Sequence, residues 1–174
     1  PNIVMIMSEA FSDISNSESI NFDEYGDPLE FYNQFINRDD VISGHIVVPN
    51  FGGGTSDTEF DVLTGCSTKY IDSSQVSYNF IRKPMEAMPR LLKNIGYDTL
   101  AIHPGYGWFY NRTNVYKNMG FDDFIYLEED FEPSTQNKGG YISDEVTTQS
   151  IIDNFENHVK NNDDPLFEFC VTIQ

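Results

Sequence analysis

Short apolar runs recur along the chain, each bounded by polar residues or glycine. Runs of about four to eight apolar residues favour β-strands, and an uninterrupted run is typical of a strand buried on both faces. The first run, NIVMIM at residues 2–7, has that character, whereas Pro49 weakens the end of the second. The runs that we expect to form strands are 2–7, 45–51, 98–103, 123–127 and 165–174.

Segments with helical periodicity lie between these runs. Residues 56–65 carry apolar side chains at helical spacing and close on Gly65, a good C-terminal cap. The longest such segment, residues 143–162, begins with a favourable serine N-cap. The alternation predicts an α/β fold, with a central, mostly parallel sheet flanked by helices on both faces. We assign residues 1–174 to a single domain, which suits a chain of this length.

The composition is that of a globular protein with a strongly acidic surface. Apolar residues make up 39% of the chain and aromatic residues 14%, which excludes a disordered protein. The formal net charge of −18 argues against a nucleic-acid partner, because phosphate backbones are bound by Lys and Arg. The charge fits a secreted or cell-surface protein, or one that gathers divalent cations, and a merely soluble acidic surface explains it equally well.

The cysteines, the lengths of the apolar runs and the chain ends add further expectations. Cys66 and Cys170 lack the spacing of a zinc site or a redox motif, so we expect buried free thiols. No stretch approaches the roughly 20 apolar residues that span a bilayer. Pro1 directly precedes a strand-like run, so we expect the chain to be a piece of a longer protein. Gln174 follows a strand expected to be central, where loops of an α/β active site lie, so one such loop is expected beyond it.

Three glycines stand directly before Thr55, at the start of the helix expected in residues 56–65. Glycine allows unusual backbone dihedrals and close approach to a ligand, and a helix N-terminus offers N–H groups to an anion. Gly54 and the Thr55 hydroxyl would then lie beside a bound anion. A plain loop with a Thr or Ser cap is the alternative. A phosphate-binding P-loop is excluded, since no Gly-Lys-Ser/Thr sequence follows.

Glu9 comes directly after the first predicted strand, at the carboxyl edge of the sheet. Carboxylate oxygens there suit a hard cation, although a solvated carboxylate is the simpler interpretation. If the strands are neighbours, Glu9 and Thr55 converge. A bound metal would then lower the pKa of the threonine hydroxyl and make it a usable nucleophile.

The segment IHPGYGWFYNR, residues 102–112, is the third candidate. His103 ends a predicted strand, again at the carboxyl edge. Trp108 and Tyr110 belong to an aromatic group beside Arg112, whose planar fork suits a phosphate or sulfate. A packed aromatic cluster with a surface arginine is the structural alternative.

These motifs together resemble a known family. IMSEAF, then GGGTSDTEF, then HPGYGWFYNR and a strand ending in TIQ are similar, in this order, to the lipoteichoic acid synthase branch of the sulfatase-like, alkaline-phosphatase-type superfamily. The resemblance covers nearly the whole chain. True sulfatases carry Cys-x-Pro-Ser-Arg running into Leu-Thr-Gly, and an ungapped overlay places Thr55 on the nucleophile. Asp57 and Glu59 replace the proline and the arginine, so the formylglycine precursor is absent and classical sulfate-ester hydrolysis is not expected.

The resemblance implies a two-step phosphoglycerol transferase. Thr55 would attack the head group of phosphatidylglycerol and release diacylglycerol, and a hydroxyl of a cell-envelope polymer or glycolipid would then collect the group. Mn²⁺ or Mg²⁺ would be held by Glu9 and Thr55 with an Asp-His pair beyond residue 174. Arg112, Tyr110 and His103 would bind the glycerophosphate, and we add Trp108 and Gly54 to the expected substrate-binding residues.

The chain departs from the synthase at two positions. Gly105 replaces an acidic residue that contacts substrate, and Tyr110 replaces a tryptophan. Because the expected Asn-His sequence and the Asp-His metal pair lie beyond residue 174, we expect this fragment alone to be inactive. A phosphodiesterase or sulfuric ester hydrolase of the same fold, in which water takes the second step, is the first alternative. A non-catalytic module that binds anionic lipid or glycan is the second.

The resemblance also implies a location. The parent protein would carry transmembrane helices before Pro1 and hold this domain on the extracellular face of a bacterial membrane. No nucleic-acid partner is expected.

Overall fold

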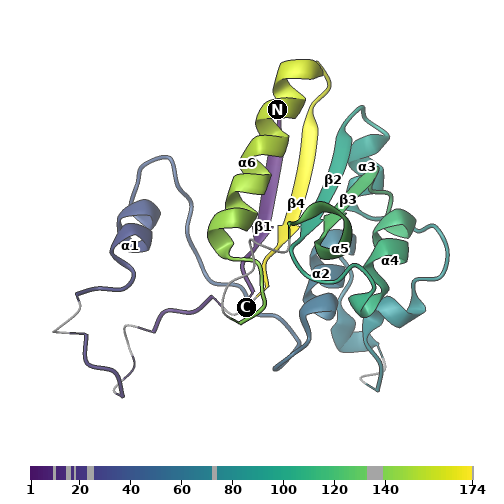
Figure 1. The fold of residues 1–174 in the computed structure, drawn as a ribbon. Helices are drawn as coiled ribbons and strands as arrows, with labels where there is room; N and C mark the ends of the chain where they lie inside the picture. Colours follow the sequence, from purple (N-terminus) through teal and green to yellow (C-terminus); the bar gives the residue numbers. More distant parts are fainter. Residues whose placement is uncertain are drawn as a thin grey trace. The chain divides into compact units, whose positions relative to one another are not determined.

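A four-stranded parallel sheet forms the centre of the structure, a computed structural model (Figure 1). The strand order is β1-β4-β2-β3, and every neighbouring pair is parallel. The last strand of the chain is therefore central, as predicted. The strands are β1 (Ile3–Met7), β2 (Asp98–His103), β3 (Asp123–Tyr126) and β4 (Leu166–Val171).

The structure describes residues 1–9, 11–14, 17, 19–22, 26–71, 74–132 and 139–173. The chain divides into two units, Pro1–Glu9 with Val48–Gln174, and Ala10–Val47. The first unit contains the sheet and all the candidate site residues. None of the helices in these described ranges is long and apolar enough to cross a membrane.

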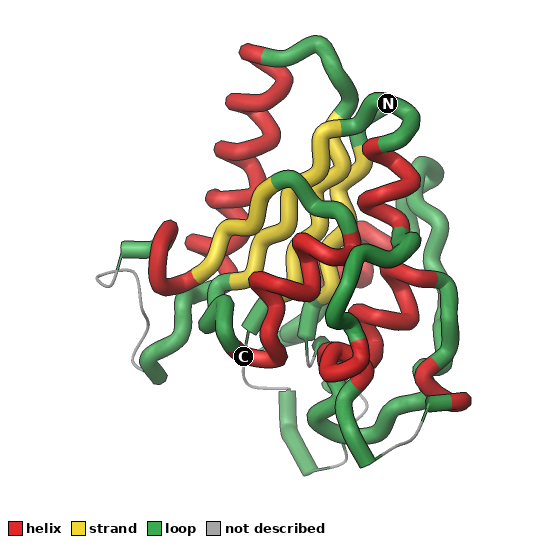
Figure 2. Tube along the Cα trace, turned by 90° about the vertical axis from the view of Figure 1, so that its right-hand side faces the viewer, coloured by secondary structure: helices red, strands yellow, loops and turns green. Residues whose placement is uncertain are grey.

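Helices cover both faces of the sheet, which confirms the predicted α/β architecture. Helix α6 (Asp144–Asn161) lies on one face, and α2 (Thr55–Thr64), α3 (Met88–Lys93) and α4 (Arg112–Met119) lie on the other (Figure 2). The larger core contains Phe167 and Phe169 of β4, and the smaller core, beneath α6, contains Cys170. Alternate side chains of β4 thus enter opposite cores, as the pleat of a strand requires.

The helix ends follow the sequence signals. Gly65 caps α2 with a left-handed φ of 67°, and Gly120 caps α4 with a φ of 105°, which are conformations that side chains other than glycine rarely adopt. The Ser143 hydroxyl accepts the Val146 N–H at 3.3 Å and caps α6, whose first turn is acidic.

Some of the short helices were not predicted. Helix α1 (Glu30–Ile36) belongs to the second unit, and none of its residues is buried. The other short elements are α5 (Leu127–Asp130) and the 3₁₀ helices η1 (Thr68–Tyr70), η2 (Ser77–Phe80) and η3 (Phe109–Asn111).

Three expectations from the sequence were wrong. Residues 45–51 form no strand, and a proline that cannot donate to a ladder stands within them. Strand β1 is not buried on both faces: it is the outermost strand of the described sheet, its alternate residues Ile3, Met5 and Met7 are partly buried, and Val4 and Ile6 are 43% and 52% exposed. Both cysteines are free thiols as expected, but Cys66 is exposed and only Cys170 is buried.

Glu168 is a buried carboxyl group at the centre of the sheet. It lies on β4 between Val4 of β1 and Leu100 of β2, is 0% exposed, and has no hydrogen-bond partner at either carboxyl oxygen. Burial raises the pKa of Glu168 to about 7. The pKa is higher in the folded state than in the unfolded chain, so folding favours the protonated acid. The protonated Glu168 therefore gives the folded state its full stability below about pH 4.5. The free energy of unfolding falls as the pH rises through about 7 and the buried carboxyl group ionises.

We therefore expect Glu168→Gln to stabilise the protein more at pH 8 than at pH 4.5. The gain in the free energy of unfolding between the two conditions should be about 3 kcal/mol, because one pKa unit corresponds to about 1.4 kcal/mol. Urea unfolding at both pH values measures it. Glu156→Gln, at an exposed carboxylate of α6, is the control. An equal effect of Glu168→Gln at both pH values would contradict the buried, unpaired state of this carboxyl group.

Candidate active site

The carboxyl edge of the sheet brings two predicted residues close together. Glu9 lies just after β1, and its backbone N–H donates to the hydroxyl of Thr172, just after β4, at 2.9 Å. His103 is the last residue of β2, and its Nδ1 lies 2.9 Å from the carbonyl oxygen of Val171. Because a carbonyl only accepts, Nδ1 carries the proton and Nε2 is left as an acceptor. Parallel strands that end at one edge allow both contacts.

Thr55 is the first residue of α2, directly after the glycine triplet. Gly52 and Gly53 have φ values of 60° and 70°, which only glycine adopts readily. Gly54 is the N-cap, and its carbonyl accepts the backbone N–H of Asp57 at 3.0 Å. The predicted succession of a glycine turn and a helix start at Thr55 is therefore present.

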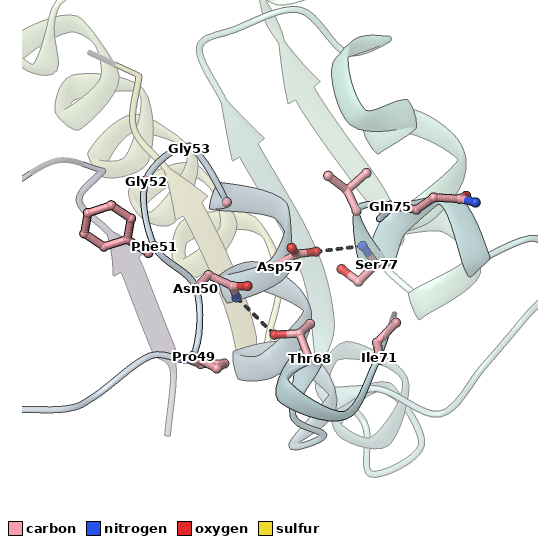
Figure 3. Close-up of a pocket in the computed structure, with 12 residues that line it drawn as sticks. Pro49, Asn50, Phe51, Gly52, Gly53, Asp57, Thr68, Ile71, Gln75 and Ser77 are labelled. Carbon is pink, nitrogen blue, oxygen red and sulfur yellow. Dashed lines mark hydrogen bonds between the residues drawn. The ribbon is translucent and has the colours of Figure 1, made fainter. Parts of the chain in front are cut away.

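The glycine loop also lines a cavity of about 370 Å³ (Figure 3). Its polar side chains bind neighbouring protein groups: Asp57 accepts the Ser77 N–H at 2.6 Å, and the Asn50 amide donates to the Thr68 hydroxyl at 3.0 Å. Gly54 lines this cavity and not the one beside Thr55. These bonds hold the loop in place.

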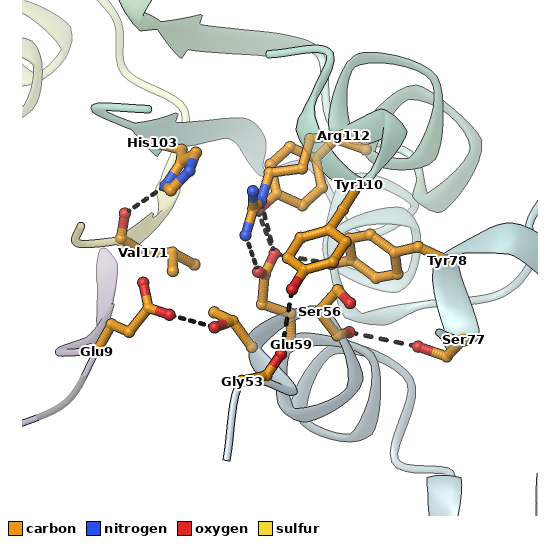
Figure 4. Close-up of polar contacts among 12 residues, drawn as sticks. Glu9, Gly53, Ser56, Glu59, Ser77, Tyr78, His103, Tyr110, Arg112 and Val171 are labelled. Atoms are coloured by element: carbon orange, nitrogen blue, oxygen red, sulfur yellow. Dashed lines mark hydrogen bonds and ion pairs between the residues drawn. The ribbon is translucent and has the colours of Figure 1, made fainter. Parts of the chain in front are cut away.

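A second cavity, of about 200 Å³, lies beside the Thr55 hydroxyl. That hydroxyl donates a hydrogen bond to the carboxylate of Glu9, so the side chains expected to converge are in contact. Figure 4 shows Glu9, His103, Tyr110 and Arg112 around this region. The predicted site residues that line the cavity are Glu9, Thr55, His103, Tyr110 and Arg112.

Arg112 is buried rather than on the surface. It is 1% exposed, and it binds the carboxylate of Glu59 through Nη2 at 2.5 Å and through Nε at 3.3 Å. Its third nitrogen, Nη1, is buried and has no hydrogen-bond partner. Burial opposes the charge of Arg112, but the charge and hydrogen bonds of Glu59, together with Tyr116 and Tyr78, raise the pKa of Arg112 above its ordinary value. The cavity is thus bordered by a permanent cation with one free donor group.

Two tyrosines complete the surroundings of Glu59. The Tyr78 hydroxyl donates to Oε2 of Glu59 at 2.9 Å and the Tyr116 hydroxyl at 2.6 Å. Burial, followed by the charge of Glu59, raises the pKa of both phenols well above the ordinary value, so they remain donors. Removing one partner of such a buried pair costs about 3–5 kcal/mol, because a charge is left uncompensated.

A strained turn positions Tyr110 and Arg112. Tyr110 and Asn111 have φ values of 55° and 58°, the only non-glycine residues with positive φ in the described part of the chain. Residues in this region cost about 1–3 kcal/mol each, and they occur at functional sites more often than elsewhere. The turn allows the Tyr110 hydroxyl to donate to the Gly53 carbonyl at 3.1 Å. The Arg112 guanidinium lies 5.2 Å from the centre of the Tyr110 ring.

His103 is a neutral histidine at physiological pH. It is 2% exposed, and burial, assisted by the positive charge of Arg112, lowers the pKa of His103 to about 4. The free Nε2 therefore accepts hydrogen bonds at the edge of the cavity. A cationic role for His103 is not favoured.

Trp108 stands outside the cavity. It is 66% exposed and stacks on Tyr106 with ring centres 5.4 Å apart, and it meets Phe109, which lines the cavity, at 5.8 Å. Gly105 lies against His103 and Ile173. A Cβ atom at Gly105 would approach Nε2 of His103 to 2.5 Å. The loss of an acidic side chain at residue 105 therefore leaves room for the ring of His103.

Glu9 and Thr55 provide two adjacent oxygen ligands, which suit a hard divalent cation. Within the ranges that the structure describes, no group of three or more His, Cys, Asp or Glu side chains is arranged to hold a metal ion. The pair fits Mn²⁺ or Mg²⁺ in chemistry but needs further ligands from elsewhere in the protein.

Glu59, Tyr78 and Tyr116 were missed as site residues from the sequence. Glu59 was noted only as a departure from the sulfatase motif. One signal was available, because Glu59 follows Thr55 by one helical turn and so projects from the same side of α2. The tyrosines carry no such signal, since only the folded chain brings η2 and α4 to this carboxylate.

Comparison with known families agrees with this fold and geometry. A family model described as Sulfatase matches residues 1–174. The chain belongs to the Sulfatase family. A putative cyclic β-1,2-glucan modification protein of Rhizobium meliloti is 34% identical over 175 residues, which cover 100% of this chain and 25% of the relative.

Two solved structures share the fold. The lipoteichoic acid synthase LtaP from Listeria monocytogenes matches with a TM-score of 0.78 and 22% identity, over 99% of this chain and 40% of that chain. The phosphoglycerol transferase GacH of Streptococcus pyogenes, solved in complex with sn-glycerol-1-phosphate, matches with a TM-score of 0.74 and 25% identity, over 99% of this chain and 44% of that chain. The sulfatase-like fold expected from the motifs is thereby confirmed. This chain spans less than half of each of these proteins.

We expect Gly105→Ala to destabilise the protein by about 1–3 kcal/mol, because the new methyl group forces the buried His103 ring away from the Val171 carbonyl. Gly44→Ala is the matched control, since a Cβ atom at Gly44 meets nothing within 4 Å. Urea unfolding of both variants measures the difference. Equal stability of the two would show that His103 is not held as the structure indicates.

Proposed function

We propose that the protein transfers a phosphoglycerol group from phosphatidylglycerol to a hydroxyl of a cell-envelope polymer or glycolipid, with Thr55 as covalent nucleophile. One observation carries this proposal: a single cavity is lined by Thr55, by Glu9 in contact with its hydroxyl, and by Arg112, whose Nη1 is free. A hydroxyl, a carboxylate and a fixed cation are the groups that transfer of an anionic phosphoryl group requires. The similarity to GacH, solved with sn-glycerol-1-phosphate, supports the choice of group.

In the first step, Oγ of Thr55 attacks the phosphorus of the donor. The new Oγ–P bond forms as the P–O bond to diacylglycerol breaks. The Thr55 hydroxyl donates a hydrogen bond to Glu9, so its oxygen lone pairs point away from the carboxylate. Glu9 accepts the hydroxyl proton as Oγ attacks. The diacylglycerol oxygen takes up a proton as it leaves.

In the second step, the acceptor hydroxyl attacks the same phosphorus from the position that diacylglycerol vacated. The acceptor hydroxyl gives up its proton as its oxygen bonds to phosphorus, the Oγ–P bond breaks, and Thr55 regains a proton in exchange. Throughout, Nη1 of Arg112 donates to a non-bridging phosphate oxygen, where negative charge is concentrated. Nε2 of neutral His103 accepts a hydrogen bond from a glycerol hydroxyl.

A divalent cation, Mn²⁺ or Mg²⁺, would be held by Glu9 and Thr55 together with further ligands from elsewhere in the full-length protein. When bound, it would lower the pKa of the threonine hydroxyl and neutralise charge on the phosphate. The oxygen ligands present here suit either ion.

A glucan is the acceptor that we favour. The relative with 34% identity is described as a putative cyclic β-1,2-glucan modification protein. The exposed stack of Tyr106 and Trp108 next to the cavity offers flat apolar faces to a sugar ring. We place the domain on the extracellular face of a bacterial membrane, held there by helices in the parent protein, because phosphatidylglycerol is a membrane lipid.

Hydrolysis is the second candidate, since the family match is to Sulfatase. In that case water replaces the acceptor in the second step, and the substrate is a phosphodiester or a sulfuric ester. The two candidates share the nucleophile and differ in the group that collects the intermediate.

The test incubates the full-length protein with phosphatidylglycerol and Mn²⁺ and records its intact mass. We expect the mass of one glycerophosphate to be added at Thr55, and none in Thr55→Ala. Thr58→Ala is the matched control, because Thr58 lies on the same helix and does not line the cavity. An unmodified protein with Mn²⁺ bound would exclude phosphatidylglycerol as the donor.

The fate of the adduct separates the two candidates. Addition of β-1,2-glucan should release the adduct and yield a glucan that carries phosphoglycerol. Release at the same rate with and without glucan, with free glycerophosphate as product, would establish a hydrolase instead.

A further inference from the structure

Glu59 is a buried carboxylate that receives more donors than a salt bridge needs. It is 0% exposed, and Nη2 and Nε of Arg112 reach it at 2.5 and 3.3 Å. The hydroxyls of Tyr78 and Tyr116 donate to it at 2.9 and 2.6 Å. Since both tyrosines are buried as well, with 1% and 0% of their surface exposed, neither the carboxylate nor its donors can exchange partners with solvent.

The bonds to Glu59 fix the direction of the rest of the guanidinium. A guanidinium is planar and carries its N–H donors in a rigid fork. Once Nε and Nη2 are bound on one edge, Nη1 can point only away from Glu59. Nη1 is buried and has no partner in the protein, and Arg112 lines the cavity beside Thr55 (Figure 4). A buried, charged nitrogen without a partner, on a residue that lines a cavity, calls for an acceptor that a ligand in the cavity would supply.

Helix α2 relates this group to the nucleophile. Thr55 and Glu59 are four residues apart on α2 and so project from the same side of the helix. The helix that carries the Thr55 hydroxyl thus also carries the carboxylate that orients Arg112. Helix α2 sets the separation between the Thr55 hydroxyl and the Glu59 carboxylate, and the bonds from Glu59 to Arg112 of α4 carry that spacing to the guanidinium. The bonds from Tyr78 of η2 and Tyr116 of α4 prevent Glu59 from turning.

We propose that Glu59 is a positioning residue, which acts through Arg112 to aim Nη1 at one oxygen of a tetrahedral oxyanion bound at Thr55. Glu59 does not touch the substrate. The identification of the oxyanion as a phosphodiester rests on the proposed function, but the positioning itself requires only that a phosphate or sulfate binds in this cavity.

The test measures the dissociation constant of inorganic phosphate for the full-length protein by calorimetry. We expect Glu59→Gln to weaken phosphate binding about tenfold, because the amide of glutamine turns one donor toward the guanidinium and releases it from its fixed orientation. In a background of Arg112→Lys, the same change should leave the affinity unchanged or improve it. A lysine has one ammonium, and the loss of Glu59 frees that group for the phosphate.

This reversal separates positioning from a structural role. If Glu59 only stabilises the fold, Glu59→Gln lowers the melting temperature and changes phosphate affinity by the same factor in both backgrounds. That result would overturn the proposal, as would unaltered affinity in Glu59→Gln. If Glu59→Gln does not fold, the Arg112→Lys variant alone tests the proposal. We expect it to bind phosphate at least about tenfold more weakly, although the positive charge is retained. Unchanged affinity in Arg112→Lys would overturn the proposal.

The outcomes also separate this proposal from the proposed function. Phosphate affinities that follow the expected pattern, without an adduct from phosphatidylglycerol, would leave Glu59 as a positioning residue and reject the phosphoglycerol donor. Failure of the wild-type protein to bind phosphate or sulfate at all would reject the positioning role.

Discussion

The buried ion pair between Glu59 and Arg112 connects the two helices on which the candidate active site depends. Glu59 belongs to α2, which begins at Thr55, and Arg112 begins α4. The pair contributes little net stability by itself, since burying two charges costs about as much as their attraction returns. Its structural effect is to hold a cation near the start of α2, with one nitrogen free for a ligand.

The remaining groups of the site are fixed by the end of the sheet. Parallel strands bring Glu9 and His103 to one edge, and both are bound to residues just at or beyond the end of β4. The turn at Tyr110 and Asn111 then joins this edge to α4 at the cost of two left-handed residues. Strain of this kind persists only where surrounding contacts determine it, and here the bond from Tyr110 to the glycine loop is one of them.

Much of the fold could be predicted from the sequence because local signals agree with it. The run at 165–174 is mostly apolar, with Glu168 within it, and the strand it forms is buried along its whole length between two neighbours. Gly65 and Gly120 end helices because glycine readily adopts the left-handed φ values that these caps require. The run at 45–51 has the same composition as a strand but finds no partner in the sheet, and strand pairing is a long-range property that composition does not reveal.

The site could be predicted in part. Glu9, Thr55 and His103 follow from their places at strand and helix ends. Tyr110 and Arg112 follow from an aromatic group beside a guanidinium that suits an anion, and the motif resemblance then gave them substrate-binding roles. A surface arginine was the structural alternative for Arg112, whereas the folded chain buries it against Glu59. The convergence of Tyr78 and Tyr116 on the same carboxylate depends on packing between elements far apart in the chain, so no local pattern indicates it.

The central claim is that an oxyanion binds between Thr55 and Nη1 of Arg112 while Glu59 holds the other edge of the guanidinium. A crystal structure of the full-length protein with inorganic phosphate tests it most directly. We expect one phosphate oxygen about 2.7–3.1 Å from Nη1 and the phosphorus about 3–3.5 Å from Oγ of Thr55, with Nε and Nη2 still bound to Glu59. A phosphate bound away from Thr55, or an Arg112 that leaves Glu59 to reach it, would contradict the account.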